Sequence, residues 1–101
     1  MIAVGLGGIW IEMLKDVSLR LLPISIDDVK QMLSELRGAP LLDGFRGGPA
    51  VDITLLADAV KRIGDAAMGL GPTLDTLEVN PLLATSDRIE ALDALATYNL
   101  Q

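Results

Sequence analysis

One stretch near the carboxyl end constrains the fold most, because apolar and polar residues alternate along it. Leu77 and Val79 alternate with Glu78 and Asn80, which is the period-two pattern of a β-strand with one apolar and one polar face. A turn-forming run follows at residues 84–87, and the alternation then resumes. The pattern therefore predicts an antiparallel hairpin.

A four-residue loop in this hairpin would place Asn80 opposite Ala91 and Glu78 opposite Asp93. Cross-strand partners share one side of a sheet, and opposed carboxylates repel. A divalent cation removes that conflict, since carboxylate and amide oxygens are ligands that Mg²⁺ accepts. We therefore predict that Glu78, Asn80 and Asp93 converge on a metal site. The alternative is an ordinary solvated face, and either a loop of odd length or a bulge at Pro81 would alter the register.

The rest of the chain predicts an α+β fold. Val29, Met32, Leu33 and Leu36 recur at helical spacing after Ser25, a residue type that often caps helices. We expect a largely antiparallel sheet with two helices on one face, in a single domain spanning residues 1–101. The expected elements are strands at 1–4, 9–14 and 17–22, helices at 26–37 and 53–68, and the hairpin.

Composition excludes several classes of function. The formal charge of −6 argues against a nucleic-acid or membrane-surface partner, since both require basic patches. The chain has neither cysteine nor histidine, so it carries no thiolate metal site and no histidine acid–base pair. We expect a cytoplasmic protein, because no leader or membrane-spanning run is evident. Half of the residues are hydrophobic, an excess that fits a piece packing against more protein or against a second copy.

Two stretches could contact a nucleotide. Gly7 and Gly8 could form a backbone nest that approaches phosphate, or a simple tight turn. Glu12 falls among apolar neighbours, so it requires a partner if it is buried, and Arg20 could provide one. Arg46 is followed by two glycines and suits bidentate phosphate binding, although pairing with Asp43 within the loop is an equal alternative.

Three runs of sequence together resemble a known family. The run from Glu78 to Leu83, with Asp93 following, is similar to the end of the ATP-grasp module of nucleoside-diphosphate-forming acyl-CoA synthetases. It is also similar to the succinyl-CoA synthetase β-subunit. The runs at 5–17 and 40–47 agree with this resemblance and occur in family order. One departure follows Asp93, where the family usually continues with Ala-Arg and this chain has Ala94 and Leu95.

The resemblance implies a C-terminal ATP-grasp subdomain that works with ATP or ADP, Mg²⁺ and, in the complete enzyme, CoA. By position, Asn80 and Asp93 match metal ligands, and Glu78 matches a glutamate that contacts a phosphohistidine. Gly7, Gly8, Glu12 and Arg46 are the expected nucleotide contacts. The expected partners are the remaining synthetase domains or subunits, because the first subdomain, the CoA-binding domain and the histidine are lacking. The alternative is a non-catalytic ATP-grasp-like module for regulation or subunit assembly.

Overall fold

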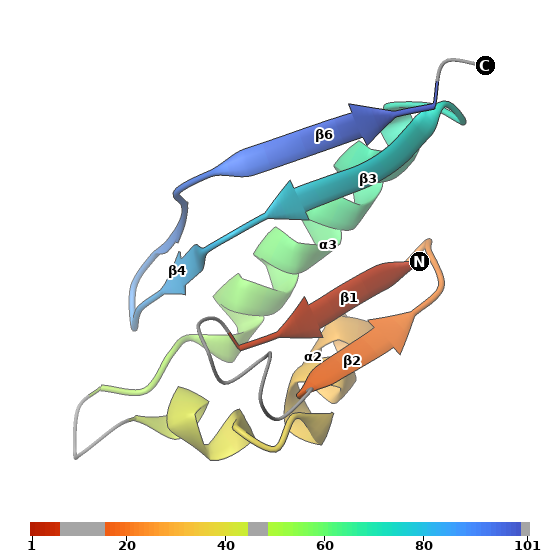
Figure 1. Cartoon of the computed structure of the whole chain (residues 1–101). Coiled ribbons are helices and arrows are strands. Elements are labelled where there is room, and N and C mark those ends of the chain that lie inside the picture. Colours follow the sequence, from red (N-terminus) through yellow and green to blue (C-terminus); the bar gives the residue numbers. More distant parts are fainter. Residues whose placement is uncertain (7–15, 45–48, 100–101) are drawn as a thin grey trace.

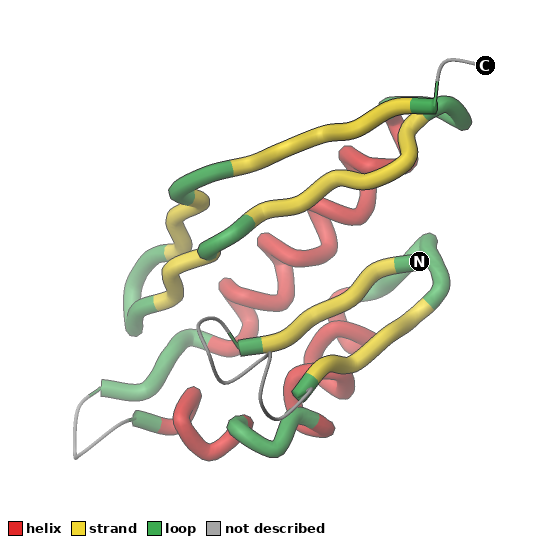
Figure 2. The backbone as a smooth tube through the Cα atoms, viewed as in Figure 1, coloured by secondary structure: helices red, strands yellow, loops and turns green. Residues whose placement is uncertain are grey.

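The computed structural model describes residues 1–6, 16–44 and 49–99 (Figure 1). Within these residues, strands pair in antiparallel fashion and two α-helices lie behind them (Figure 2). In chain order the elements are β1 (Ile2–Gly5), β2 (Val17–Arg20), α2 (Ile26–Glu35), the 3-10 helix η1 (Ala39–Asp43), α3 (Ile53–Gly69), β3 (Leu74–Val79), β4 (Leu82–Ala84), β5 (Ile89–Ala91) and β6 (Ala94–Tyr98).

Both α-helices begin where the sequence places their caps. The Ser25 side chain accepts from the Asp28 N–H, and the Asp28 carboxylate accepts from the Ser25 N–H, so the two residues form a capping box. Asp52 caps α3 by accepting from the Leu55 N–H at 2.9 Å. Helix α2 ends at Glu35, short of the expected boundary at residue 37, because the next residue adopts an extended backbone.

The hydrophobic core lies between the two helices and the strands. Val29 and Met32 are completely buried on α2, and Ala57 is completely buried on α3. Gly64 allows this close packing, since a Cβ there would stand 2.8 Å from a methyl group of Leu22. Such contacts explain why α3 accommodates a glycine at an interior position that costs about 1 kcal/mol relative to alanine.

The strands form three separate ladders. β1 pairs with β2, β3 with β6, and β4 with β5, all antiparallel. The α+β class with antiparallel pairing is thus confirmed. The described strands do not join into one hydrogen-bonded sheet, however. β1 and β3 run in the same direction in Figure 1 without pairing, and residues of both line one cleft.

The hairpin register differs from the expected one by two residues. Only two residues separate Thr85 from Arg88, and the Thr85 N–H donates to the Arg88 carbonyl at 2.9 Å. Glu78 therefore pairs with Leu95, and the predicted pairing of Glu78 with Asp93 was wrong. A register shift occurs between residues 74 and 76, away from Pro81. Because the error is an even number of residues, each side chain keeps its predicted face.

Candidate functional site

The hairpin brings Glu78, Asn80 and Asp93 to the same face. The Asn80 N–H donates to the Asp93 carbonyl at 3.1 Å, so these two residues are direct cross-strand neighbours. The predicted pairing of Asn80 with Ala91 was therefore wrong, since Ala91 pairs with Leu82. The three side chains line one small cavity of about 170 Å³. We call them the hairpin cluster.

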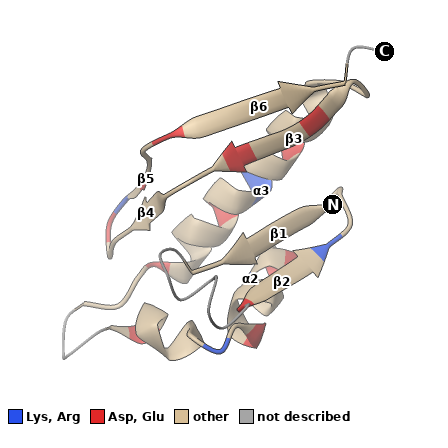
Figure 3. Cartoon of the chain, in the orientation of Figure 1, with Lys and Arg blue, Asp and Glu red and all other residues tan. Residues whose placement is uncertain are grey.

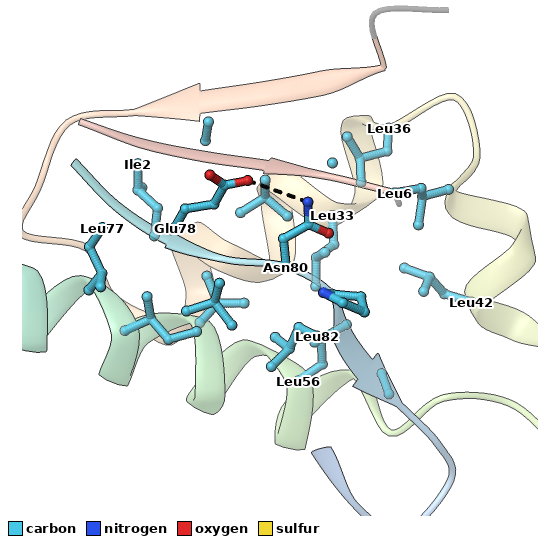
Figure 4. Close-up of a pocket in the computed structure, with 18 residues that line it drawn as sticks. Ile2, Leu6, Leu33, Leu36, Leu42, Leu56, Leu77, Glu78, Asn80 and Leu82 are labelled. Atoms are coloured by element: carbon cyan, nitrogen blue, oxygen red, sulfur yellow. Dashed lines mark hydrogen bonds between the residues drawn. The ribbon is translucent and has the colours of Figure 1, made fainter. Parts of the chain in front are cut away.

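Two hydrogen bonds hold the side chains of the hairpin cluster. The Asn80 Nδ2 atom donates to Glu78 Oε1 at 3.4 Å, the contact drawn in Figure 4. The Asp93 Oδ1 atom accepts from the Ala94 N–H at 2.9 Å. The Asn80 amide oxygen and the second Asp93 oxygen are not engaged by these bonds. Such oxygens are the atoms that Mg²⁺ binds.

The charge around the hairpin cluster is negative. Figure 3 shows acidic residues on β3 and at the start of β6. Among the described residues, the three ion pairs involve Arg20, Lys61 and Arg62, and none includes an acid of the hairpin cluster. Nor do three Asp, Glu, His or Cys side chains gather into a metal-binding group there. Of the side chains that the structure describes, a cation at this site would therefore use the Asn80 amide beside two carboxylates at most.

The other predicted nucleotide contacts lie outside the described residues. They are Gly7, Gly8, Glu12 and Arg46. Expected pairings of Glu12 with Arg20 and of Arg46 with Asp43 therefore stay predictions.

In the described structure Arg20 pairs with a residue other than the expected Glu12. Its guanidinium forms an ion pair with Glu35 on α2. The hydrogen bond from Arg20, followed by one from the Ser18 hydroxyl, lowers the pKa of Glu35 below its ordinary value of 4.5. Asp58 pairs with Arg62, one of the two partners that helical spacing allows.

The sequence pattern did not identify two residues, one at the hairpin cluster and one beside α2. Leu95 lines the cavity of the hairpin cluster and lies directly opposite Glu78. The correct loop length would have revealed it. Asp16 is buried and accepts from the backbone N–H groups of Arg37 and Gly38 at 2.6 and 2.8 Å.

Within the described part of the chain, no helix is both long enough and apolar enough to cross a membrane.

Comparison with known proteins gives consistent matches. The chain is 42% identical over 90 residues to the β-subunit of ADP-forming acetate–CoA ligase I from Pyrococcus furiosus, a match that covers 89% of this chain and 38% of that subunit. It is 37% identical over 87 residues to the ADP-forming acetate–CoA ligase of Methanocaldococcus jannaschii, covering 86% of this chain and 12% of the relative. This chain thus spans well under half of either relative.

A solved structure agrees with these matches. The dinucleotide-forming acetyl-coenzyme A synthetase 1 of Ca. Korarchaeum cryptofilum superposes with a TM-score of 0.88 and 34% identity, over 96% of this chain and 45% of that one. That protein was solved with coenzyme A and Mg-AMPPCP, its phosphohistidine segment pointing towards the nucleotide-binding site. A family model described as the ATP-grasp domain matches residues 1–97. This chain therefore belongs to the ATP-grasp domain family, and its similarity is to the ADP-forming acetyl-CoA synthetases.

Proposed function

We propose that this chain supplies the magnesium and phosphoryl-transfer contacts of a larger ADP-forming acyl-CoA synthetase in the cytoplasm. Asn80 and Asp93 would hold Mg²⁺ beside ATP or ADP, and Glu78 would contact the phosphorylated group. CoA and the acyl substrate would bind elsewhere in that enzyme, on its remaining domains or subunits. The observation that carries the proposal is the convergence of these three side chains on one cavity.

The donor set fits magnesium. Mg²⁺ is usually held by one or two carboxylates, with waters and substrate phosphates completing its coordination. The Asn80 amide nitrogen is engaged with Glu78, which leaves the amide oxygen as the ligand atom. Asp93 retains one carboxylate oxygen beyond the one that accepts from Ala94. A cavity of about 170 Å³ has room for the cation together with a few waters, each of which occupies roughly 30 Å³.

Glu78 has a separate task in this proposal. Its carboxylate already accepts from the Asn80 amide and can also accept from an imidazole N–H, which would orient that ring. This chain contains no histidine, so the imidazole would come from another part of the enzyme. A magnesium ion held by Asn80 and Asp93 would supply positive charge against the phosphate oxygens.

The test uses Mn²⁺ as a paramagnetic substitute for Mg²⁺, added with ADP to the isotope-labelled chain. NMR signals close to the bound ion should broaden first, and we expect the broadening to centre on Glu78, Asn80 and Asp93. Asp93→Asn should abolish it, because a carboxylate ligand becomes a neutral amide. Asp75→Asn is the matched control: it changes the net charge equally and lies on β3, as Glu78 does, but it does not line the cavity.

Two results would contradict the proposal. Equal losses in Asp93→Asn and Asp75→Asn would mean that Mn²⁺ responds only to the overall negative charge. Broadening that does not centre on the hairpin cluster in a folded sample would favour the non-catalytic module. Backbone chemical shifts of both variants should match those of the parent chain, which establishes that each one folds.

A further inference from the structure

Leu95 is an apolar side chain in an otherwise polar place. Its neighbours in the cavity of about 170 Å³ are Glu78, Asn80, Asp93 and Ala94, so it is the one large apolar side chain among the described residues that line this cavity. The residue is 60% exposed. Single exposed leucines are common on protein surfaces and need no explanation by themselves. A leucine inside a proposed cation site, however, adds neither a ligand nor a charge.

Leu95 lies directly opposite Glu78. The two residues are cross-strand partners in the β3–β6 ladder, so their Cβ atoms stand about 5 Å apart on the same face of the sheet. The helices lie behind the ladder (Figure 2), and both side chains are exposed. A group that approaches the Glu78 carboxylate from solvent therefore also meets the methyl groups of Leu95.

The Glu78 carboxylate has one oxygen left for a donor from another part of the enzyme. Its Oε1 atom accepts from the Asn80 amide at 3.4 Å, which leaves Oε2 for a second donor. Glu35 differs in this respect, because its carboxylate accepts from Arg20 within the chain. The residue opposite Glu78 is a leucine, which donates no hydrogen bond and carries no charge. Glu78 Oε2 thus stays open to solvent beside an apolar surface.

A flat ring with an N–H on its edge matches this pair of side chains best. Its edge can donate to Glu78 Oε2, while one of its faces covers the Leu95 methyl groups and removes them from water. A lysine ammonium is strongly hydrated and gains little from an apolar neighbour. A guanidinium binds a carboxylate best through both oxygens, and Asn80 already engages one of them. Imidazole has the required shape and, in its neutral form, a single N–H.

We propose that Leu95 is a positioning residue for the histidine that Glu78 contacts. The imidazole ring lies with one face against the Leu95 methyl groups and donates its N–H to Glu78, and the leucine keeps water away from that hydrogen bond. A ring that is held at one nitrogen and along one face has little rotational freedom left, so its second nitrogen keeps one direction. The inference rests on the proposed function for the source of this histidine, since the chain contains none.

The experiment adds N-acetylhistidine methylamide to the isotope-labelled chain, without metal or nucleotide, at about pH 8.5. The ring is then neutral, because the ordinary pKa of histidine is about 6.5. We expect the Leu95 methyl signals to move upfield, as protons against the face of an aromatic ring do, and to show nuclear Overhauser effects to the ring protons of the compound. Because one small group binds weakly, the initial slope of the Glu78 carboxyl-carbon shift against concentration gives the relative affinity.

Three substitutions separate positioning by Leu95 from a general apolar effect. Leu95→Thr removes most of the apolar contact but keeps a residue suited to a strand, and we expect the slope to fall about three- to fivefold. Leu95→Ile should retain the slope, because it keeps the apolar side chain. Leu83→Thr is the matched control, since it makes the same change at an exposed leucine of β4 that does not line the cavity. The slope should stay unchanged there.

Three outcomes would overturn this inference. Absent Overhauser effects, or an equal slope in Leu95→Thr and the parent chain, would show that the ring does not use the leucine. Equal losses in Leu95→Thr and Leu83→Thr would show that the compound binds to apolar surface in general. A larger shift of the Leu95 methyl signals with adenosine than with the histidine compound would assign the leucine to a nucleoside subsite. None of these results bears on Mn²⁺ broadening at Asp93, so the two proposals fail separately.

Discussion

Two polar clusters on opposite sides of this molecule are built differently. At the junction of β2 and α2, Glu35 meets the Arg20 guanidinium and the Ser18 hydroxyl. In the hairpin cluster, Glu78 and Asp93 have an amide between them and form no ion pair within the described residues. The first cluster neutralises its charge internally. The second keeps its negative charge, as a site must if it is to bind a cation.

This contrast indicates why acidic residues alone are a poor guide to a metal site. Both clusters contain carboxylates on or beside short strands, and both are at least partly exposed. They differ in whether the fold provides a basic partner. An exposed ion pair contributes little to stability, whereas a carboxylate left without a cation can still gain one from solution.

The largest expected effect is on the β2–α2 side, at Asp16. Its carboxylate accepts from the N–H groups of Arg37 and Gly38, just after α2. Asp16→Ala would leave both donors without this acceptor in a largely buried place, so we expect a loss of about 1–3 kcal/mol in the free energy of unfolding. Urea denaturation followed by circular dichroism measures it.

The control for this substitution is Asp75→Ala, which removes an exposed acid on β3. We expect it to change the free energy of unfolding by no more than about 0.5 kcal/mol. Asp16→Asn should retain part of the stability, because its amide oxygen still accepts one hydrogen bond. An equal loss for all three variants would mean that Asp16 acts only through its charge.

A second prediction concerns a substitution that neutralises part of the negative charge of the hairpin cluster. Leu95→Arg places a guanidinium directly opposite Glu78, as Arg20 stands beside Glu35. Without nucleotide, we expect the affinity for Mn²⁺ alone to fall about tenfold, since one charge near a partly exposed site is worth on the order of 1–2 kcal/mol. Folding stability should change by less than about 1 kcal/mol.

Leu95→Gln is the matched variant for that test, because it introduces a polar side chain without charge. It should leave the Mn²⁺ affinity nearly unchanged. If Leu95→Arg and Leu95→Gln weaken Mn²⁺ binding equally, the effect comes from losing an apolar neighbour, and the electrostatic account of the hairpin cluster is wrong. Isothermal titration at low ionic strength gives the clearest comparison, since salt screens exposed charges.

Local features of the fold could be predicted from the sequence because they depend on neighbouring residues. The caps at Ser25 and Asp52 and the apolar stripes of both helices involve contacts within a few positions. The hairpin register could not be fixed in that way. It depends on a two-residue turn at which the Arg88 N–H donates to the Thr85 hydroxyl, and an alternating pattern does not specify the length of its own loop.

The shared face of these three side chains was predicted although the register was not, and the reason is physical. An error of two residues changes every cross-strand partner yet preserves every face, so Glu78, Asn80 and Asp93 still converge. The cleft between β1 and β3 had no counterpart in the pattern. It depends on how two ladders separated by more than fifty residues are spaced over the helices, and periodicity within a single strand carries no such information.

A third prediction concerns a substitution that removes the ion pair between Arg20 of β2 and Glu35 of α2. Arg20→Met keeps much of the aliphatic length but removes the cation beside Glu35. Because the pair is partly exposed, we expect only a small loss in the free energy of unfolding. The pKa of Glu35 should rise back towards 4.5, since its main lowering cause is the hydrogen bond from Arg20. Carboxyl-carbon NMR titration measures that change.

The smallest effect concerns acid stability. Folding lowers the pKa of Glu35, so its contribution is fully present above the unfolded value of 4.5 and is lost as the pH falls through the folded value. The backbone hydrogen bond from Ser25 lowers the pKa of Asp28 in the same direction from 3.8. We therefore expect the melting temperature to begin falling below about pH 4.5.

Glu35→Gln tests the origin of this dependence. It should flatten the part of the profile just below pH 4.5 that Glu35 contributes, while the later decline from Asp28 persists. Glu90→Gln is the control, because Glu90 lies exposed on β5 away from both clusters. If Glu35→Gln leaves the whole profile unchanged, the Arg20–Glu35 pair is not formed in solution. The β2–α2 cluster would then lack internal neutralisation, and its contrast with the hairpin cluster would no longer hold.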